Sequence, residues 1–264
     1  MTTDFRAPAR TAEREPAVQL YSIRDRLANN MRGALTDLLE IGVTRVEAFG
    51  FGSETTTLVD LANSAGLEVA STHANFLSDP GAHPDLDKLF ETARSAGIST
   101  VIEPMLPRER FAHPDDIEAV ADALNRAAAI AARHSVRVGY HNHDWELSTR
   151  HAETSALEVL HTLLDHRVVF ELDAFWADAG GVPAADLLSR LGSRVALLHV
   201  KDGGHPLSRE TQRPAGRGDL DIVAVLAAAP HADRVVEFDL SDESILSAIA
   251  ESIAFVRASD ESRR

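Results

Sequence analysis

From Pro16 onward the chain alternates short apolar runs with longer amphipathic stretches, and this alternation repeats eight times. The apolar runs are candidate strands, placed at residues 17–23, 43–52, 67–76, 98–105, 136–143, 168–176, 194–202 and 234–240. The amphipathic stretches are candidate helices, placed at 31–42, 56–66, 86–97, 115–133, 156–164, 184–191, 221–229 and 243–257. Strict strand–helix alternation predicts a parallel sheet whose faces are covered by helices.

Such a repeat can close into a barrel or wind as an open sheet, and two features favour the barrel. Eight units within about 250 residues match the usual size of a (β/α)₈ barrel. An open sheet of the dinucleotide-binding kind carries a glycine-rich fingerprint after its first strand, and none follows residues 17–23. We therefore predict an α/β fold with a single (β/α)₈ TIM barrel over residues 16–264. Residues 1–15 are polar, of mixed charge and without the apolar segment of a signal peptide, which predicts a flexible N-terminal tail.

The composition excludes several classes of site and partner. The 264 residues include no cysteine, which rules out disulfides, zinc–thiolate sites and cysteine nucleophiles. The formal net charge of -15 argues against binding to nucleic acid or to an anionic membrane. No apolar run approaches the roughly 20 residues of a membrane-spanning helix. We expect a cytoplasmic protein that acts on a small molecule, and whether it forms a homo-oligomer stays open.

Polar side chains gather where the predicted strands end, which is the position that carries active sites in such barrels. The candidates along the chain are Glu47, His73, Asn75, Glu103, His141, Asn142, His143, Trp145, Glu146, Glu171, Asp173, Trp176, His199, Lys201, Asp202, Glu237 and Asp239. Burying many ionisable groups together costs too much free energy unless they are paired or bound to a cation. Histidine and carboxylate ligands without thiolates suit one divalent ion: Mn²⁺, Zn²⁺, Co²⁺, Fe²⁺ or Mg²⁺. A purely structural polar network is the alternative.

Four of these strand ends carry segments that resemble a known family. GYHNHDWEL (139–147), ELDAFWADAGG (171–181), HVKDG (199–203) and VVEFD (235–239) are similar to the sugar phosphate isomerase/epimerase family of xylose isomerase-like TIM barrels. The resemblance covers about residues 17–257 and implies one divalent metal held by the last four strands. It implies the ligands Asp173, His199 and Glu237, with His141 standing where many members have a first glutamate ligand. The YHNH run (140–143) is closer to an inosose-dehydratase-like subgroup.

The resemblance implies an isomerase or epimerase that acts on a sugar or keto-sugar. Such an enzyme removes the proton next to a carbonyl, and a divalent cation stabilises the resulting enediolate. We expect Glu237 to be the base. His141 replaces one of the family's two opposed carboxylates, so the second base would be His141, His143 or Glu146.

The same replacement keeps two other functions open. A histidine suits protonation of a leaving group, which favours a dehydratase or lyase that eliminates from a keto-sugar, a keto-inositol or a 3-keto-glycoside. A non-catalytic partner barrel is a third, weaker hypothesis. An endonuclease with a three-metal cluster is disfavoured, because no histidine lies near Glu47 and the net charge is wrong for DNA.

The candidate residues outside the metal-ligand set are assigned to catalysis or to substrate binding, and Glu237 belongs to both the ligand set and the catalytic set. The catalytic set is Glu237, His143, Lys201 and Glu146, and the substrate-binding set is Trp145, Trp176, His73, Glu103 and Arg217. Lys201 would neutralise oxyanion charge or bind a hydroxyl; a salt bridge to Asp202 or Glu237 is the alternative. The two tryptophans would form flat walls for a carbohydrate, or simply pack under a loop. Arg217, in the glycine-containing loop 214–221, would bind a hydroxyl or phosphate or else be an exposed side chain. Glu171 and Asp202 are candidates for orienting the metal ligands.

Overall fold

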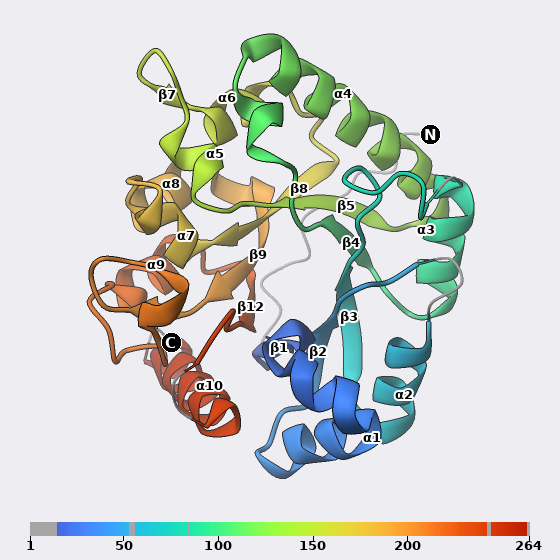
Figure 1. Cartoon of the computed structure of the whole chain (residues 1–264), viewed down its shortest axis with the longest axis vertical. Coiled ribbons are helices and arrows are strands. Elements are labelled where there is room, and N and C mark those ends of the chain that lie inside the picture. Colours follow the sequence, from blue (N-terminus) through green and yellow to red (C-terminus); the bar gives the residue numbers. More distant parts are fainter. Residues whose placement is uncertain (1–14, 53–55, 84, 242–243, 263–264) are drawn as a thin grey trace.

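Eight parallel strands close into a barrel in the computed structural model, which describes residues 15–52, 56–83, 85–241 and 244–262 (Figure 1). Their order around the barrel is β1-β12-β9-β8-β5-β4-β3-β2. The strands are β1 (Ala17–Gln19), β2 (Arg45–Ala48), β3 (Glu68–His73), β4 (Thr100–Glu103), β5 (Arg137–His141), β8 (Val168–Asp173), β9 (Val195–Val200) and β12 (Asp233–Val236). This confirms the predicted barrel. The predicted tail, apart from Glu15, lies outside the described residues.

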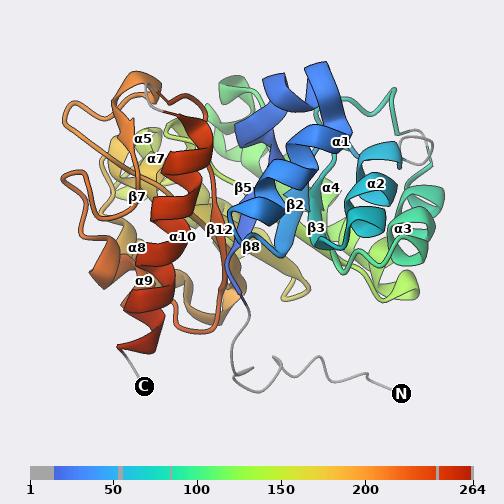
Figure 2. The same cartoon turned by 90° about the horizontal axis from the view of Figure 1, so that it is seen from below.

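Helices surround the ring of strands and bury the apolar face of each strand that points outward (Figure 1). They are α1 (Arg24–Glu40), α2 (Thr57–Ala65), α3 (Leu86–Ser95), α4 (Pro114–Ala131), α6 (Ala156–Leu163), α8 (Ala184–Leu191), α9 (Ile222–Ala228) and α10 (Ile245–Glu261). Figure 2 shows α10 and α1 covering the strands on the side of β12 and β2. Within the described residues, none of these helices has the length and apolarity needed to span a bilayer.

Smaller elements interrupt the repeat on the carboxyl side of the strands. Two short helices, α5 (Trp145–Ser148) and α7 (Ala174–Ala179), follow β5 and β8 directly. Two short hairpins pair β6 (Arg150–His151) with β7 (Thr154–Ser155) and β10 (Asp202–Gly203) with β11 (Gln212–Arg213). All four lie in connections from a strand to the next helix, which is where such barrels build their active sites.

The first strand is shorter than predicted. β1 ends at Gln19, a 3₁₀ turn (η1, Leu20–Ile23) follows, and α1 begins at Arg24 instead of residue 31. Leu20, Ile23 and Leu27 are all buried, and their spacing of three and four residues is helical. The run of three charged residues between Ile23 and Leu27 made this helical spacing hard to recognise in the sequence. Asn30, with φ -156° and ψ 85°, breaks α1 just before the helix that the sequence predicted.

Inside the barrel, apolar side chains fill the amino-terminal part and polar side chains fill the carboxyl-terminal part. We call the apolar part the floor. Ala17, Ile102, Leu197 and Val235, from four different strands, form a small cluster separate from the main core. Two residues further along three of these strands lie Gln19, His199 and Glu237, which are all buried. Because side chains alternate along a strand, these polar residues share the inward face with the apolar floor. The barrel therefore directs its polar side chains toward its carboxyl end.

Candidate functional site

Four side chains from neighbouring barrel strands converge at this carboxyl end. His141 ends β5, Asp173 ends β8, His199 lies on β9 and Glu237 follows β12. One ligand atom of each lies within 4.8 Å of the other three. All are buried, with at most 5% of the residue surface exposed. We call these four residues, which sequence analysis assigned as metal ligands, the upper group.

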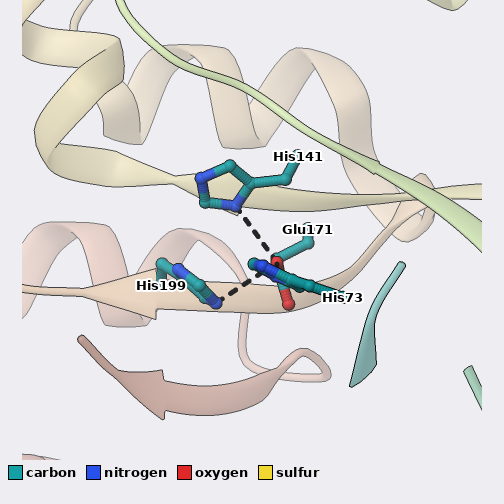
Figure 3. A group of neighbouring side chains, drawn as sticks. All are labelled: His73, His141, Glu171 and His199. Carbon is teal, nitrogen blue, oxygen red and sulfur yellow. Dashed lines mark hydrogen bonds and ion pairs between the residues drawn. The ribbon is translucent and has the colours of Figure 1, made fainter. Parts of the chain in front are cut away.

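A second set of side chains lies deeper in the barrel and shares two histidines with the first. His73, His141, Glu171 and His199 also offer ligand atoms within 4.8 Å of one another, and we call them the deep group (Figure 3). Oε2 of Glu171 is 2.6 Å from Nε2 of His73 and 3.1 Å from Nδ1 of His141. Nε2 of His199 is 3.2 Å from the same oxygen and 2.9 Å from Oε1 of Glu47. Glu171 thus contacts both histidines of the upper group, as sequence analysis expected.

Mutual charge, more than solvent, decides the protonation of these buried groups. Burial lowers the pKa of the His73 imidazole, but the Glu171 and Glu47 carboxylates outweigh it and raise that pKa to about 10. Burial raises the pKa of Glu171, yet His199 and His73 hold it well below its usual value. The same balance, with Lys201 and His199 as the cations, holds the pKa of Glu237 well below its usual value. Both glutamates are therefore carboxylates at neutral pH.

Lys201 brings a buried ammonium group to the acidic side of the upper group. Its Nζ lies 2.7 Å from Oδ2 of Asp173, 2.5 Å from Oε2 of Glu237 and 3.1 Å from Oδ2 of Asp239. The contact with Asp173 is an ion pair without hydrogen-bond geometry, and Oδ2 has no hydrogen-bond partner among the described residues. Burial raises the pKa of Asp173 despite the opposing effect of Lys201. The histidine nitrogens and carboxylate oxygens that converge here are a donor set that fits a divalent cation.

Three aromatic rings line the site beside His141. The ring of His143 stacks on Trp145 with centroids 4.6 Å apart, and it lies 6.1 Å from the ring of Trp176 and 5.1 Å from that of His141. Nδ1 of His143 and Nε1 of both tryptophans are buried and have no hydrogen-bond partner among the described residues. Burial and the adjacent His141 hold the pKa of His143 well below its usual value, so its imidazole is neutral. We call the rings of His143, Trp145 and Trp176 the wall. It combines flat apolar faces with unpartnered nitrogens, a combination that suits a hydroxylated ring.

Glu146 lies behind this wall and contacts the loop that carries His143. Its carboxylate accepts hydrogen bonds from the Tyr140 hydroxyl at 2.5 Å and from the backbone N–H of His143 at 2.9 Å. Burial raises the pKa of Glu146 to about 7, although both hydrogen bonds lower it. These contacts tie the Glu146 carboxylate to the backbone of His143 and to the hydroxyl of Tyr140.

Three other predicted substrate-binding residues have specific partners. Glu103 is fully buried and accepts hydrogen bonds from Ser78 Oγ and the backbone N–H of Leu77, both at 2.6 Å, so it fixes the loop after β3. His73 belongs to the deep group. The structure does not bring Arg217 to these residues: its guanidinium is half exposed and binds Glu251 on α10 at 2.8 Å.

The expected role of Asp202 in orienting a metal ligand is wrong. Its carboxylate accepts hydrogen bonds from the backbone N–H groups of Gly203, Gly216, Gly218 and Leu220, at 2.8–3.1 Å. A short acidic side chain at a strand end can satisfy several loop amides at once, and here it does so in place of contacting a histidine. Asp202 therefore shapes the loop between β11 and α9.

Two residues that contact the deep group, Gln19 and Glu47, could hardly be recognised as functional from the sequence. Gln19 donates a hydrogen bond to Oε1 of Glu47 at 2.8 Å, and both side chains are fully buried. Sequence analysis named Glu47 as a strand-end residue without giving it a role, and it did not consider Gln19. The feature that could have indicated Gln19 is its position as a polar residue directly after the apolar Ala17 and Val18 of β1.

Comparisons with known proteins agree with this architecture. A family model described as "xylose isomerase-like TIM barrel" matches residues 35–258. A search of curated proteins found no match.

Solved structures share the fold at low sequence identity. A sugar phosphate isomerase/epimerase from Parabacteroides distasonis is 24% identical with a TM-score of 0.77, and the alignment covers 97% of each chain. A probable 3-DHS dehydratase, AsbF, from Bacillus anthracis is 11% identical with a TM-score of 0.71, over 92% of this chain and 99% of that one. The IOLI protein with a bound zinc atom is 16% identical with a TM-score of 0.63, over 93% and 96% of the two chains.

Proposed function

The chain belongs to the xylose isomerase-like TIM barrel family, and on that premise we propose that it is a divalent-metal-dependent isomerase or epimerase of a sugar or keto-sugar. The observation that carries the proposal is the upper group, whose four ligand atoms all lie within 4.8 Å of one another. The fold is shared with a sugar phosphate isomerase/epimerase and with a zinc-binding protein, which supports this choice.

The upper group would hold the cation through His141, Asp173, His199 and Glu237. Its nitrogen and oxygen donors suit Mn²⁺, Zn²⁺, Co²⁺ or Fe²⁺, with Mg²⁺ the hard-ion alternative. A divalent cation bound there would act as a Lewis acid on the carbonyl and hydroxyl oxygens of a substrate.

Glu237 would accept the proton from the carbon next to the substrate carbonyl. It is ionised, and it follows a barrel strand, so its position is rigid. The electron pair of the broken C–H bond moves to the carbonyl oxygen, giving an enediolate. Lys201, whose ammonium is 2.5 Å from Glu237, would stabilise that negative charge. His143, whose ring centroid lies 5.1 Å from that of His141, would exchange a proton with the substrate and so provide the second acid–base group.

The wall of His143, Trp145 and Trp176 would bind the substrate. Indole rings pack against the C–H face of a sugar, and their N–H groups donate to its hydroxyls. The unpartnered Nε1 atoms of both tryptophans support this role. Glu146 would act through His143 by holding the backbone of its loop.

A dehydratase or lyase acting on a keto-sugar, a keto-inositol or a 3-keto-glycoside is the second candidate. Two observations favour it: His141 stands in place of a carboxylate, and a probable dehydratase shares the fold. The first step would be the same, and an imidazole would then protonate the departing oxygen.

Incubation of the metal-loaded protein with keto-sugars and inososes in D₂O, followed by mass spectrometry, tests the proposal. We expect one deuterium at the carbon next to the carbonyl and an otherwise unchanged mass. A product lighter by one water, or split in two, would overturn isomerisation in favour of elimination. No exchange together with no stoichiometric metal in the purified protein would leave only the partner-barrel hypothesis.

A further inference from the structure

Each histidine of the upper group presents its two ring nitrogens to two different sets of carboxylates. Nδ1 of His199 lies 3.1 Å from Oε2 of Glu237, while its Nε2 lies 2.9 Å from Oε1 of Glu47. His141 has the opposite arrangement: its Nε2 is 3.9 Å from Oδ2 of Asp173, and its Nδ1 is 3.1 Å from Oε2 of Glu171. The barrel thus places one nitrogen of each ring toward the ligand carboxylates and the other toward the deep carboxylates.

We propose that Glu47 and Glu171 are positioning residues that select which nitrogen of each histidine binds the cation. With a cation bound, Glu47 accepts the Nε2–H of His199, and Nδ1 gives up its proton and binds the ion. Glu171 accepts the Nδ1–H of His141, which leaves Nε2 free. The inference rests on the proposed function, because it takes the upper group as the metal site.

The physical reason is the chemistry of imidazole. A neutral ring carries one N–H and one lone pair, and the hydrogen bond made by one nitrogen determines which nitrogen binds a metal. A carboxylate acceptor also makes the opposite nitrogen more basic, which strengthens the metal–ligand bond. Since both carboxylates have no exposed surface, water does not weaken these interactions.

Two further side chains hold the deep carboxylates in place. The Nε2 atom of His73 lies 2.6 Å from Oε2 of Glu171 and 3.3 Å from Oε1 of Glu47, so one ring nitrogen contacts both carboxylates. Gln19 donates to the same Glu47 oxygen at 2.8 Å. Each carboxylate oxygen that faces a histidine is therefore held from a second direction.

The alternative is that the deep group itself holds the ion. Oε2 of Glu47 and Oε1 of Glu171 have no hydrogen-bond partner among the described residues, a feature that would suit a cation there. The two arrangements exclude each other, because an N–H that donates to a carboxylate cannot bind a metal at the same atom. If His141 and His199 bind an ion in the upper group, their other nitrogens are donors to the deep group.

Metal titrations of variants separate the two arrangements. We expect Glu47→Gln and Glu171→Gln each to bind one Zn²⁺ or Co²⁺ about 10–100-fold more weakly than the unchanged protein. The absorption bands of the Co²⁺ form should shift as well, because the donor strength of one histidine changes. Glu103→Gln is the matched control: it removes another fully buried glutamate from a barrel strand end, but Glu103 contacts the loop at Leu77 and Ser78 instead of a histidine of the upper group. Its metal affinity should not change.

Two results would overturn the positioning role. Unchanged affinity in both Glu47→Gln and Glu171→Gln would show that the deep carboxylates do not influence the ligands. Loss of binding in Glu171→Gln together with retention in Asp173→Asn would place the ion in the deep group.

A second measurement needs no variant. In the Zn²⁺-loaded protein with ¹⁵N-labelled histidine, imidazole NMR correlations report which nitrogen carries the proton. We expect Nε2–H for His199 and Nδ1–H for His141, and the opposite tautomers would refute the inference even if the glutamate variants failed to fold. Failure of the unchanged protein to bind any stoichiometric metal would instead refute the proposed function, so the two failures are distinguishable.

Discussion

The Oδ1 atom of Asp173 accepts a hydrogen bond from the backbone N–H of Trp176 at 3.0 Å, in the first turn of α7. The other oxygen, Oδ2, faces Lys201 and the upper group. One carboxylate therefore caps a helix and offers a ligand atom at the same time. This cap explains why β8 ends at Asp173, although sequence analysis extended the strand to residue 176.

Two substitutions of Asp173 distinguish its role as a helix cap from its role as a metal ligand. Both substitutions remove the charge of the carboxylate and its ion pair with Lys201, so both should lose metal. Asp173→Asn keeps an oxygen for the cap, whereas Asp173→Ala does not, so without metal Asp173→Ala should be less stable than Asp173→Asn by about 1 kcal/mol. Metal analysis and urea denaturation in the presence of a chelator measure the two effects. Equal metal content in Asp173→Asn and the unchanged protein would contradict the ligand assignment.

His143→Gln should retain metal and lose turnover. His143 lies outside both groups of candidate ligands, and its ring stacks on Trp145 beside the site. Removal of an acid–base group lowers kcat by roughly 10²–10⁴-fold. The check is kcat together with metal content per chain. If His143→Gln empties the site whereas His141→Gln does not, the wrong histidine of the YHNH run has been assigned as the ligand.

The protonation of Glu146 should make the free energy of unfolding depend on pH. Burial raises its pKa to about 7 from a usual value of 4.5. Between these values the folded protein keeps the proton that the unfolded chain releases, so the free energy of unfolding should fall as pH rises from about 4.5 to 7 and then level off. The decline from this group is on the order of 3 kcal/mol.

Urea denaturation across this pH range checks the effect. Glu146→Gln should show a smaller decline than the unchanged protein. Glu103 supplies a matched second case, because burial also raises its pKa to about 7. The double variant should be flatter than either single one. Parallel curves for Glu146→Gln and the unchanged protein would rule out a raised pKa at Glu146.

Neighbouring residues in the loop after β11 should respond very differently to alanine. A Cβ at Gly218 would overlap the carboxylate of Asp202 and the backbone of Gly203, so Gly218→Ala should cost roughly 1–3 kcal/mol. Arg217→Ala removes an exposed ion pair with Glu251, which contributes less than about 1 kcal/mol. Limited proteolysis and urea denaturation compare the two. A rise in KM of Arg217→Ala for phosphorylated substrates alone would show that Arg217 leaves Glu251 to bind phosphate.

The barrel and the position of its site were accessible from sequence because both rest on local periodicity. Each strand end could be read as an apolar run that stops at a polar residue, and a parallel barrel brings all such ends to one rim. Asp173 and His199 could thus be placed near each other without knowing any contact between them.

Features that depend on contacts across the barrel were not accessible. Glu47 and His199 are 152 residues apart in the chain, and nothing local indicates that their side chains meet at 2.9 Å. Likewise, HVKD gives no sign that Asp202 turns toward backbone amides. A salt bridge from Lys201 to Glu237 was one of the expectations and is present, but its contacts with Asp173 and Asp239 were not foreseen. The alternation of side chains along a strand predicts which face a residue takes, but not which partner it finds there.

The loop between β11 and α9 keeps its course through three backbone amides, those of Gly216, Gly218 and Leu220, which all donate to one buried aspartate, Asp202. Arg217, which lies in this loop, binds Glu251 on α10 instead, and its side chain is half exposed. A substitution at such a position leaves the three hydrogen bonds to Asp202 intact. The exposed positions of the loop can therefore take side chains that alter substrate preference without changing the course of its backbone.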